Sequence, residues 1–292
     1  YRVWVSEIML QQTRVEAVKP YFERFLKALP TVEDLAQAPE EQLLKLWEGL
    51  GYYNRVRNLQ RGARAVMAEH GGVIPASFEA LKKLPGIGDY TAGAIGSIAF
   101  QIPVPAVDGN VLRVISRVLY RRDNILDAKV KRRIEGEIKE ILPERTGDFN
   151  QSLMELGATV CLPNGAPKCN ECPLQELCRA HLVGDEESLP VKTKAKKRKI
   201  EQRTVFLLVC DGKIALRKRP EKGLLAGLWE LPSQEGMLGC AEAGKLLQTW
   251  GVRTLGELQK QTDAKHIFSH VEWHMTCWYV EAALDPDADV KE

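Results

Sequence analysis

A single carboxyl group, that of Glu7, stands among apolar side chains near the start of the chain, in the stretch SEIMLQQT at residues 6–13. Burial among apolar groups raises the pKa of a carboxyl group, and a general acid that works at neutral pH needs such a raised pKa. The position therefore predicts a proton donor, although an acid on the exposed face of a helix fits it equally well. Two neutral amides, Gln11 and Gln12, end the apolar run.

Four cysteines lie close together in the stretch CLPNGAPKCNECPLQELC: Cys161, Cys169, Cys172 and Cys178. Closely spaced thiolates suit a soft metal centre, either zinc or an iron–sulfur cluster. Zinc ribbons usually carry two separated C-x-x-C pairs, whereas only Cys169 and Cys172 have that spacing, so we favour a [4Fe–4S] cluster over zinc. The chain holds seven cysteines, and this odd number indicates a reducing compartment rather than a disulfide framework.

A glycine-rich turn, LPGIG at residues 84–88, lies between two helical stretches. Gly86 and Gly88 can take positive φ and expose backbone N–H groups at the start of the next helix, where the helix dipole also favours an anion. Such a hairpin between helices holds one DNA phosphate without reading sequence. An ordinary interhelical turn is the alternative, and the neighbouring Lys82 and Lys83 favour phosphate binding.

A second acid, Asp108, stands in VDGNV at residues 107–111, just before a helical run of apolar residues. An aspartate in this place most often caps the helix N-terminus, and Asn110 is a candidate for the same task. The alternative is a carboxylate that faces a reaction site. The residues alone favour the cap.

The elements that must position these groups differ between the two parts of the chain. From residue 1 to about 182 the apolar residues follow a helical period and no convincing strand appears, which predicts an all-α domain over 1–182. The apolar faces are those of Val18, Phe22, Phe25, Leu26 and Leu29, of Ile134, Ile138, Ile141 and Leu142, and of Phe149, Leu153, Leu156 and Val160.

The second part of the chain has the pattern of a sheet with a helix. Residues 183–203 are predicted to be a linker, because a run of lysines follows GDEESLP and no apolar face is available. Apolar runs at 205–210 and 213–217 flank Asp211-Gly212, which predicts a hairpin, and the alternation over 271–279 is typical of a half-buried strand. With a short helix over 241–250, we expect a smaller α+β domain over 204–292.

Charge is unevenly distributed along the chain. Residues 1–200 hold 30 Lys and Arg against 25 Asp and Glu, and the remaining residues hold 11 against 14. A basic first part suits contact with a polyanion. No apolar run approaches the roughly 18–20 residues that a membrane-spanning helix needs. No signal peptide is evident at the start, although the chain opens at Tyr1 without a methionine, so upstream residues can be missing.

The order of SEIMLQQT, GLGYYNRVRNL (residues 49–59), LPGIG, VDGNV and the four-cysteine loop resembles the helix–hairpin–helix, iron–sulfur DNA glycosylases, and specifically the adenine DNA glycosylases of the MutY type. GLWELP (227–232) and HIFSHVEW (266–273) are similar to the Nudix-like domain of that family. The resemblance implies an all-α helix–hairpin–helix glycosylase domain with an iron–sulfur loop, linked to a smaller α+β Nudix-like domain.

The resemblance also implies an activity, that of a monofunctional DNA glycosylase in base excision repair. Such an enzyme flips out adenine mispaired with 8-oxoguanine or guanine and hydrolyses its N-glycosidic bond. By this resemblance Glu7 protonates adenine at N7, Asp108 stabilises the oxocarbenium-like sugar, and Asn110 orients Asp108. Tyr90 stands where endonuclease III-type relatives carry a lysine, and because a phenol cannot form an imine, we expect no strand cleavage but assistance near the sugar.

Further residues are implied to contact DNA, by entering the duplex, by wedging it or by binding phosphates: Gln11, Gln12, Thr13, Leu50, Tyr52, Arg55, Arg57, Gly86 and Gly88. Three more match the loop that reads 8-oxoguanine opposite the adenine: Phe268, Ser269 and His270. The four cysteines are implied to hold the [4Fe–4S] cluster.

Two features depart from the family pattern. Seven residues separate Cys161 from Cys169, where family members usually have six. The second domain lacks the glutamate-rich box of Nudix hydrolases, so we expect it to recognise a lesion and not to hydrolyse a nucleotide.

The expected partner is double-stranded DNA with 8-oxoguanine:adenine mispairs, bound by a monomer away from membranes. The expected location is the bacterial cytoplasm with its nucleoid, or a eukaryotic nucleus or mitochondrion. The rival functions are a related thymine or oxidised-pyrimidine glycosylase and, from another class, a non-catalytic DNA-binding protein.

Overall fold

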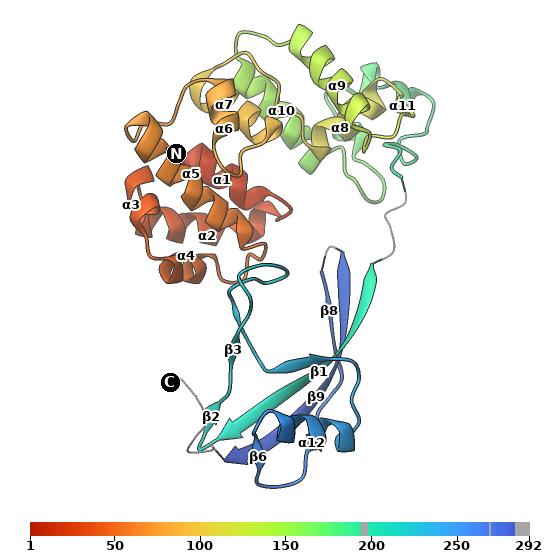
Figure 1. Cartoon of the computed structure of the whole chain (residues 1–292). Coiled ribbons are helices and arrows are strands. Elements are labelled where there is room, and N and C mark those ends of the chain that lie inside the picture. The colour runs from red at the N-terminus through yellow and green to blue at the C-terminus, as the bar shows by residue number, and fades with distance from the viewer. Residues whose placement is uncertain (194–197, 269, 284–292) are drawn as a thin grey trace. The chain divides into compact units, whose positions relative to one another are not determined.

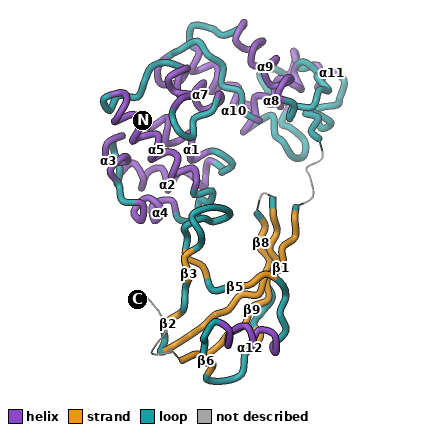
Figure 2. Tube along the Cα trace, viewed as in Figure 1, coloured by secondary structure: helices purple, strands orange, loops and turns teal. Residues whose placement is uncertain are grey.

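The computed structural model describes residues 1–193, 198–268 and 270–283, and the chain forms two compact units, Tyr1–Thr193 and Lys194–Glu292 (Figure 1). The first unit is all-helical, and the second is built on a sheet (Figure 2). The predicted fold class is therefore confirmed. None of the helices in the described part of the chain is both long and apolar enough to cross a membrane.

The described residues of the first unit form helices joined by short turns. Local capping explains several of the starts, since Thr31 begins one helix with a capping box and Asp108 and Asp127 accept N–H groups at the starts of two others. The helices are α1 (Arg2–Leu10), α2 (Val15–Ala28), α3 (Val32–Gln37), α4 (Glu40–Trp47), α5 (Asn54–His70), α6 (Phe78–Lys83), α7 (Asp89–Phe100), α8 (Gly109–Val118), α9 (Ala128–Glu140), α10 (Thr146–Thr159), the short 3-10 helices η1 (Cys169–Glu171) and η2 (Gln175–Leu177), and α11 (Arg179–Leu182).

Two buried clusters hold these helices together. The first gathers around Trp4, Phe25 and Leu59 from α1, α2 and α5, and the second around Val111 and Ile138 from α8 and α9. Helix α7 packs against α1 and also against α10, which in turn packs against α8. This arrangement brings the start of α7 and the start of α8 close to α1, although these segments are far apart in sequence.

The second unit contains a sheet in the order β2-β1-β9-β6, in which β1 and β9 run parallel. The predicted hairpin at Asp211-Gly212 is present, since Val209 pairs with Ile214 and Cys210 with Lys213. Phe206, Trp278 and Val280 pack against Leu247 of α12. The elements are β1 (Lys199–Cys210), β2 (Lys213–Ile214), β3 (Arg217–Lys218), β4 (Trp229–Glu230), β5 (Ser233–Glu235), α12 (Cys240–Thr249), β6 (Arg253–Thr254), β7 (Gln259–Lys260), β8 (Ala264–Ile267) and β9 (Val271–Ala283).

The segment predicted as a linker, 183–203, is ordered at both of its ends. Leu189 is buried against Cys178 and Ala180, and the carbonyl of Val191 accepts a hydrogen bond from the Ile125 N–H. At the other end, Lys199 already begins β1. A free tether over the whole stretch is therefore wrong, because Leu189 does find an apolar partner. Residues 194–197 of the predicted linker lie outside the described residues.

Candidate active site and metal centre

The carboxyl group of Glu7 lies inside the first unit, with 8% of the residue surface exposed. It comes from the buried face of α1, and the Tyr90 hydroxyl at the start of α7 donates a hydrogen bond to Glu7 Oε2 at 2.7 Å. The same hydroxyl lies 3.3 Å from Met154 Sδ of α10. The packing of α1, α7 and α10 thus produces a contact between residues more than eighty positions apart.

The pKa of Glu7 is raised above its ordinary value. Burial is the main cause, the negative charge of Asp108 adds to the shift, and the hydrogen bond from Tyr90 opposes it. Burial and the nearby Glu7 carboxyl group also raise the pKa of Tyr90, so its hydroxyl keeps its proton. This environment is the one that a general acid needs.

The second carboxyl group, that of Asp108, is held by two donors. Its Oδ1 accepts the Val111 N–H at 2.8 Å as the N-cap of α8, and its Oδ2 accepts a hydrogen bond from Asn110 Nδ2 at 2.8 Å. The cap that the residues alone favoured is present. Since Asp108 acts on the pKa of Glu7, the cap also leaves this carboxyl group near the buried acid.

A buried arginine that the sequence did not single out continues this network. Arg113 Nη2 donates to Asn110 Oδ1 and to the Gly157 carbonyl, each at 2.7 Å, and Arg113 Nε donates to the Cys161 carbonyl at 2.7 Å. Arg113 therefore connects the group that orients Asp108 to the first residue of the cysteine loop. The sequence does mark this residue: the positive charge of Arg113 interrupts the apolar face of the helix three residues after Asn110.

The turn between α6 and α7 has positive φ at one of its two glycines. Gly86 has φ +81°, and a Cβ at this position would lie 2.7 Å from Asn58 Cβ. Gly88 has φ −97° and is the N-cap of α7, so it does not use the positive φ that glycine permits. Lys82 forms an ion pair with Asp89 at 2.5 Å, and Lys83 is exposed on the same turn.

The polar residues after α1 lie at the surface end of the helix that carries Glu7. Gln11 Nε2 donates weakly to Thr91 Oγ1 at 3.4 Å, and Thr13 Oγ1 donates to the Gln11 carbonyl at 3.3 Å. Gln12 is exposed and has φ +57°. Tyr52 is 50% exposed and also has positive φ. These positions are compatible with contact to a duplex.

Two residues predicted to contact DNA are instead buried. Arg55 is 9% exposed, and its guanidinium donates to the carbonyls of Ile8, Met9, Gln11, Leu50 and Gly51 and to Thr13 Oγ1. A phosphate contact by Arg55 is therefore wrong, because its donors fasten the end of α1 to the turn after α4. Leu50 is 8% exposed and belongs to the core, so its prediction as a wedge is also wrong. Arg57 forms an ion pair with Glu40.

The four cysteines of the predicted cluster line one cavity (the cysteine cavity), together with apolar side chains and Arg117, His181 and Glu186. Arg117 Nη1 donates to Cys161 Sγ at 3.2 Å. Burial raises the pKa of Cys169 to about 11, with contributions from Glu186 and from the neighbouring Cys178 and Cys172, and burial also raises the pKa of Cys178. All four predicted ligands thus lie around one cavity.

The predicted lesion-reading residues lie between β8 and β9. The Phe268 ring packs edge-on against His266 and Trp273, with centroid separations of 4.4 and 4.8 Å, and His270 is exposed. Ser269 lies outside the described residues. Arg203 stacks over Trp273 at 4.2 Å, a support that the sequence did not reveal because β1 and β9 are remote in the chain.

Two protein-family models match this chain, one in each unit, and they define its class. Residues 5–140 match the model of the HhH-GPD superfamily of base excision DNA repair proteins, and residues 204–291 match that of the NUDIX domain. A solved thermostable thymine-DNA glycosylase is similar to 63% of this chain and 84% of its own, with a TM-score of 0.57 and 30% identity.

Similar curated proteins identify the family within this class. The adenine DNA glycosylase of Rattus norvegicus is 38% identical over 93% of this chain, and that of Schizosaccharomyces pombe is 35% identical over 98% of this chain and 73% of its own length. The chain belongs to the adenine DNA glycosylase family, which confirms the resemblance noted in the sequence. It spans 62% of the length of the rat relative.

Proposed function

We propose that this chain is a monofunctional DNA glycosylase of base excision repair that hydrolyses the N-glycosidic bond of adenine paired with 8-oxoguanine or guanine. The observation that carries the proposal is the buried Glu7 carboxyl group, 2.7 Å from the Tyr90 hydroxyl and within electrostatic reach of Asp108. Two carboxyl groups in unlike environments are what cleavage of a glycosidic bond requires. Family membership supports the choice of adenine.

In the proposed reaction Glu7 keeps its proton until a flipped adenine arrives, and then donates it to N7. The protonated base leaves more readily, and positive charge develops on the deoxyribose. We assign the stabilisation of that charge to Asp108, which Asn110 and the Val111 N–H hold in place. Because Tyr90 offers no amine, no imine forms. Water adds to C1′ of the sugar and loses a proton, and the product is an abasic site in an uncut strand.

We propose that Cys161, Cys169, Cys172 and Cys178 hold a [4Fe–4S] cluster. The convergence of all four residues on the cysteine cavity supports this assignment, and the donor from Arg117 to Cys161 Sγ would offset part of the negative charge of the sulfurs. When bound, such a cluster ties the loop together and can exchange electrons.

We assign binding of duplex DNA to the turn at Gly86 and to the exposed Gln12 and Tyr52. Reading of 8-oxoguanine is assigned to Phe268, Ser269 and His270 of the second unit. Hydroxyl and imidazole groups can bond the N7–H and O8 of the lesion, which distinguish it from guanine.

The test is a single-turnover glycosylase assay on paired duplexes. We expect release of adenine opposite 8-oxoguanine, with strand breaks only after alkali, and a loss of at least about a hundredfold in rate for Glu7→Gln, in line with the usual contribution of a general acid. Equal duplex binding without any abasic product would instead indicate a non-catalytic DNA-binding protein.

A thymine glycosylase is the second candidate, because the fold is similar to that of the solved thymine-DNA glycosylase. A duplex with thymine opposite guanine, assayed beside the adenine substrates, separates the two. Faster release of thymine than of adenine would replace the proposed substrate.

A further inference from the structure

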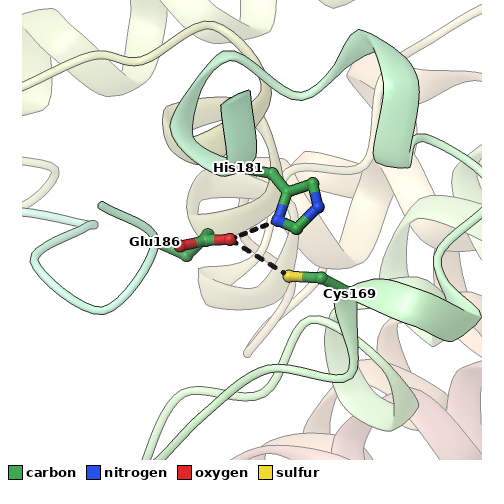
Figure 3. A group of neighbouring side chains, drawn as sticks. All are labelled: Cys169, His181 and Glu186. Carbon is green, nitrogen blue, oxygen red and sulfur yellow. Dashed lines mark hydrogen bonds and ion pairs between the residues drawn. The ribbon is translucent and has the colours of Figure 1, made fainter. Parts of the chain in front are cut away.

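We propose that Cys169, His181 and Glu186 form a mononuclear site for a divalent metal ion of the zinc class, distinct from the four-cysteine site in its ligands and sharing one sulfur with it. The three side chains come from η1, from α11 and from the segment after α11, and all three line the cysteine cavity. Figure 3 shows them side by side. We call this set the Cys-His-Glu site.

The three ligand atoms all lie within 4.8 Å of one another. Cys169 Sγ is 3.5 Å from Glu186 Oε1, and His181 Nδ1 is 2.5 Å from the same oxygen. Glu186 Oε1 thus contacts both the thiol and the imidazole (Figure 3), so a cation bound by this oxygen lies within reach of all three side chains. His181 and Glu186 have 30% and 16% of their side-chain surfaces exposed, so an ion can enter from solvent.

The ligand types select the metal. Thiolate, imidazole and carboxylate are the three donors that zinc takes in proteins, whereas magnesium and calcium require oxygen ligands. Tetrahedral bonds of about 2.0–2.3 Å separate ligand atoms by roughly 3.3–3.7 Å. The Cys169–Glu186 distance already fits, and the His181–Glu186 pair must open by about 1 Å, with water as the fourth ligand.

Neighbouring groups fix the orientation of two of the ligands. Gln175 Nε2 lies 3.2 Å from His181 Nε2, and with its amide turned to present oxygen it accepts the Nε2 proton and leaves Nδ1 for the metal. The Glu186 carbonyl accepts a hydrogen bond from Arg117 Nε at 2.8 Å, which holds the backbone of the third ligand.

Because both sites need the sulfur of Cys169, zinc and the cluster exclude each other. This competition rests on the proposed cluster. The proposed zinc site is independent of whether the cluster forms. We therefore expect zinc to block cluster assembly in the wild-type chain.

The first test uses the whole wild-type chain, prepared anaerobically without iron, freed of metal with a chelator and then titrated with Zn²⁺. We expect one tightly bound zinc ion, and X-ray absorption at the zinc edge should show one sulfur at about 2.3 Å with nitrogen and oxygen at about 2.0 Å. A shell of four sulfurs, or the absence of bound zinc, overturns the proposal.

Variants then identify the ligands. His181→Ala and Glu186→Gln should each weaken zinc binding at least tenfold, whereas Cys161→Ala, which removes a cluster ligand outside the Cys-His-Glu site, should leave it intact. The reverse pattern would place zinc on the four cysteines and refute the Cys-His-Glu site. If circular dichroism shows that a variant is unfolded, the X-ray absorption spectrum of zinc in the wild-type chain decides which side chains are the ligands.

Iron content and brown colour are measured separately in the same proteins. His181→Ala should still assemble the cluster, and should do so even in the presence of zinc. If no protein takes up iron while wild type binds zinc through these three ligands, the proposed cluster fails and the Cys-His-Glu site stands.

Discussion

At the scale of single residues, the site depends on two carboxyl groups that the fold treats differently. Glu7 is buried and has one hydrogen-bond donor, Tyr90, whereas Asp108 has two donors and caps a helix. Burial raises the pKa of a carboxyl group, whereas hydrogen bonds donated to its charged form lower it. The same functional group can therefore serve different proposed roles at the two positions.

Replacing Tyr90 by phenylalanine should shift the pH dependence of the reaction. The Tyr90 hydrogen bond lowers the pKa of Glu7, so its loss raises that pKa, and the protonated, active form persists to higher pH. We expect the alkaline limb of the single-turnover rate profile to move upward in pH for Tyr90→Phe. Tyr120→Phe, which removes a hydroxyl bonded to Asp185 at 2.8 Å, is the matched control and should leave the profile in place. A downward shift would contradict the assignment of Glu7 as the acid.

At the scale of elements, the ends of helices create the site. Arg55 fastens the end of α1 to the turn after α4, which sets where Gln11 to Thr13 emerge. The turn between α6 and α7 places Tyr90 one residue after the start of α7 and leaves the turn backbone exposed at Gly86. Substitutions at Gly86 and Gly88 measure how much the conformation of this turn contributes to the free energy of unfolding.

Alanine substitutions at Gly86 and Gly88 should have different effects on stability. Gly86→Ala forces a side chain into positive φ and against Asn58, so we expect a loss of about 2–3 kcal/mol in the free energy of unfolding. Gly88 has ordinary φ, and no atom lies within 4 Å of an added Cβ, so Gly88→Ala should cost about 1 kcal/mol or less through the weaker cap. Urea unfolding measures both, and equal losses would contradict the conformations described.

At the scale of the whole molecule, each unit has its own core, and the proposed tasks divide between them. The groups for glycosidic cleavage all lie within Tyr1–Thr193, whereas Phe268 and His270 lie in the sheet unit. The groups proposed for catalysis and the groups proposed for lesion reading therefore belong to units with separate hydrophobic cores. Substitutions in one set should leave the other set folded.

His270→Ala should reduce discrimination without reducing the chemistry. We expect the ratio of adenine release opposite 8-oxoguanine to release opposite guanine to fall roughly tenfold, the effect of about 1.4 kcal/mol of lost lesion binding. The rate opposite guanine serves as the internal control, because Glu7 and Asp108 are unchanged. A ratio equal to that of wild type would remove His270 from lesion reading.

Local pattern made a large part of this architecture predictable. The helical period of the first part and the Asp-Gly hairpin depend on neighbouring residues, and both are present in the structure. The strand predicted over 271–279 is also present, but its buried face changes after Met275, since Trp278 and Val280 are buried and Cys277 and Tyr279 are only half-buried. The four-cysteine spacing was likewise sufficient to predict that these residues line one cavity. The Asp108 cap also follows from its place just before a helix.

The solvent exposure of individual side chains could not be predicted from local sequence pattern. Arg55 and Leu50 were expected at the DNA surface, yet both are buried, because the carbonyl groups that surround Arg55 come from α1 and from the turn after α4. The same limit applied to Arg113, whose acceptor Gly157 lies on another helix, and to Leu189, which packs against Val118 and Tyr120. A residue type states which bonds a side chain can make, but not which distant group will be there.

The amino-acid sequence by itself thus determined the family, the order of the motifs, the two fold classes and the residue types available for acid catalysis and metal binding. Only the tertiary structure decided that Glu7 is shielded from water and touches Tyr90, and that a histidine and a glutamate join the cysteines. The physical reason is that a raised pKa and a metal site depend on solvent exclusion and on distances between remote segments, and packing alone sets both.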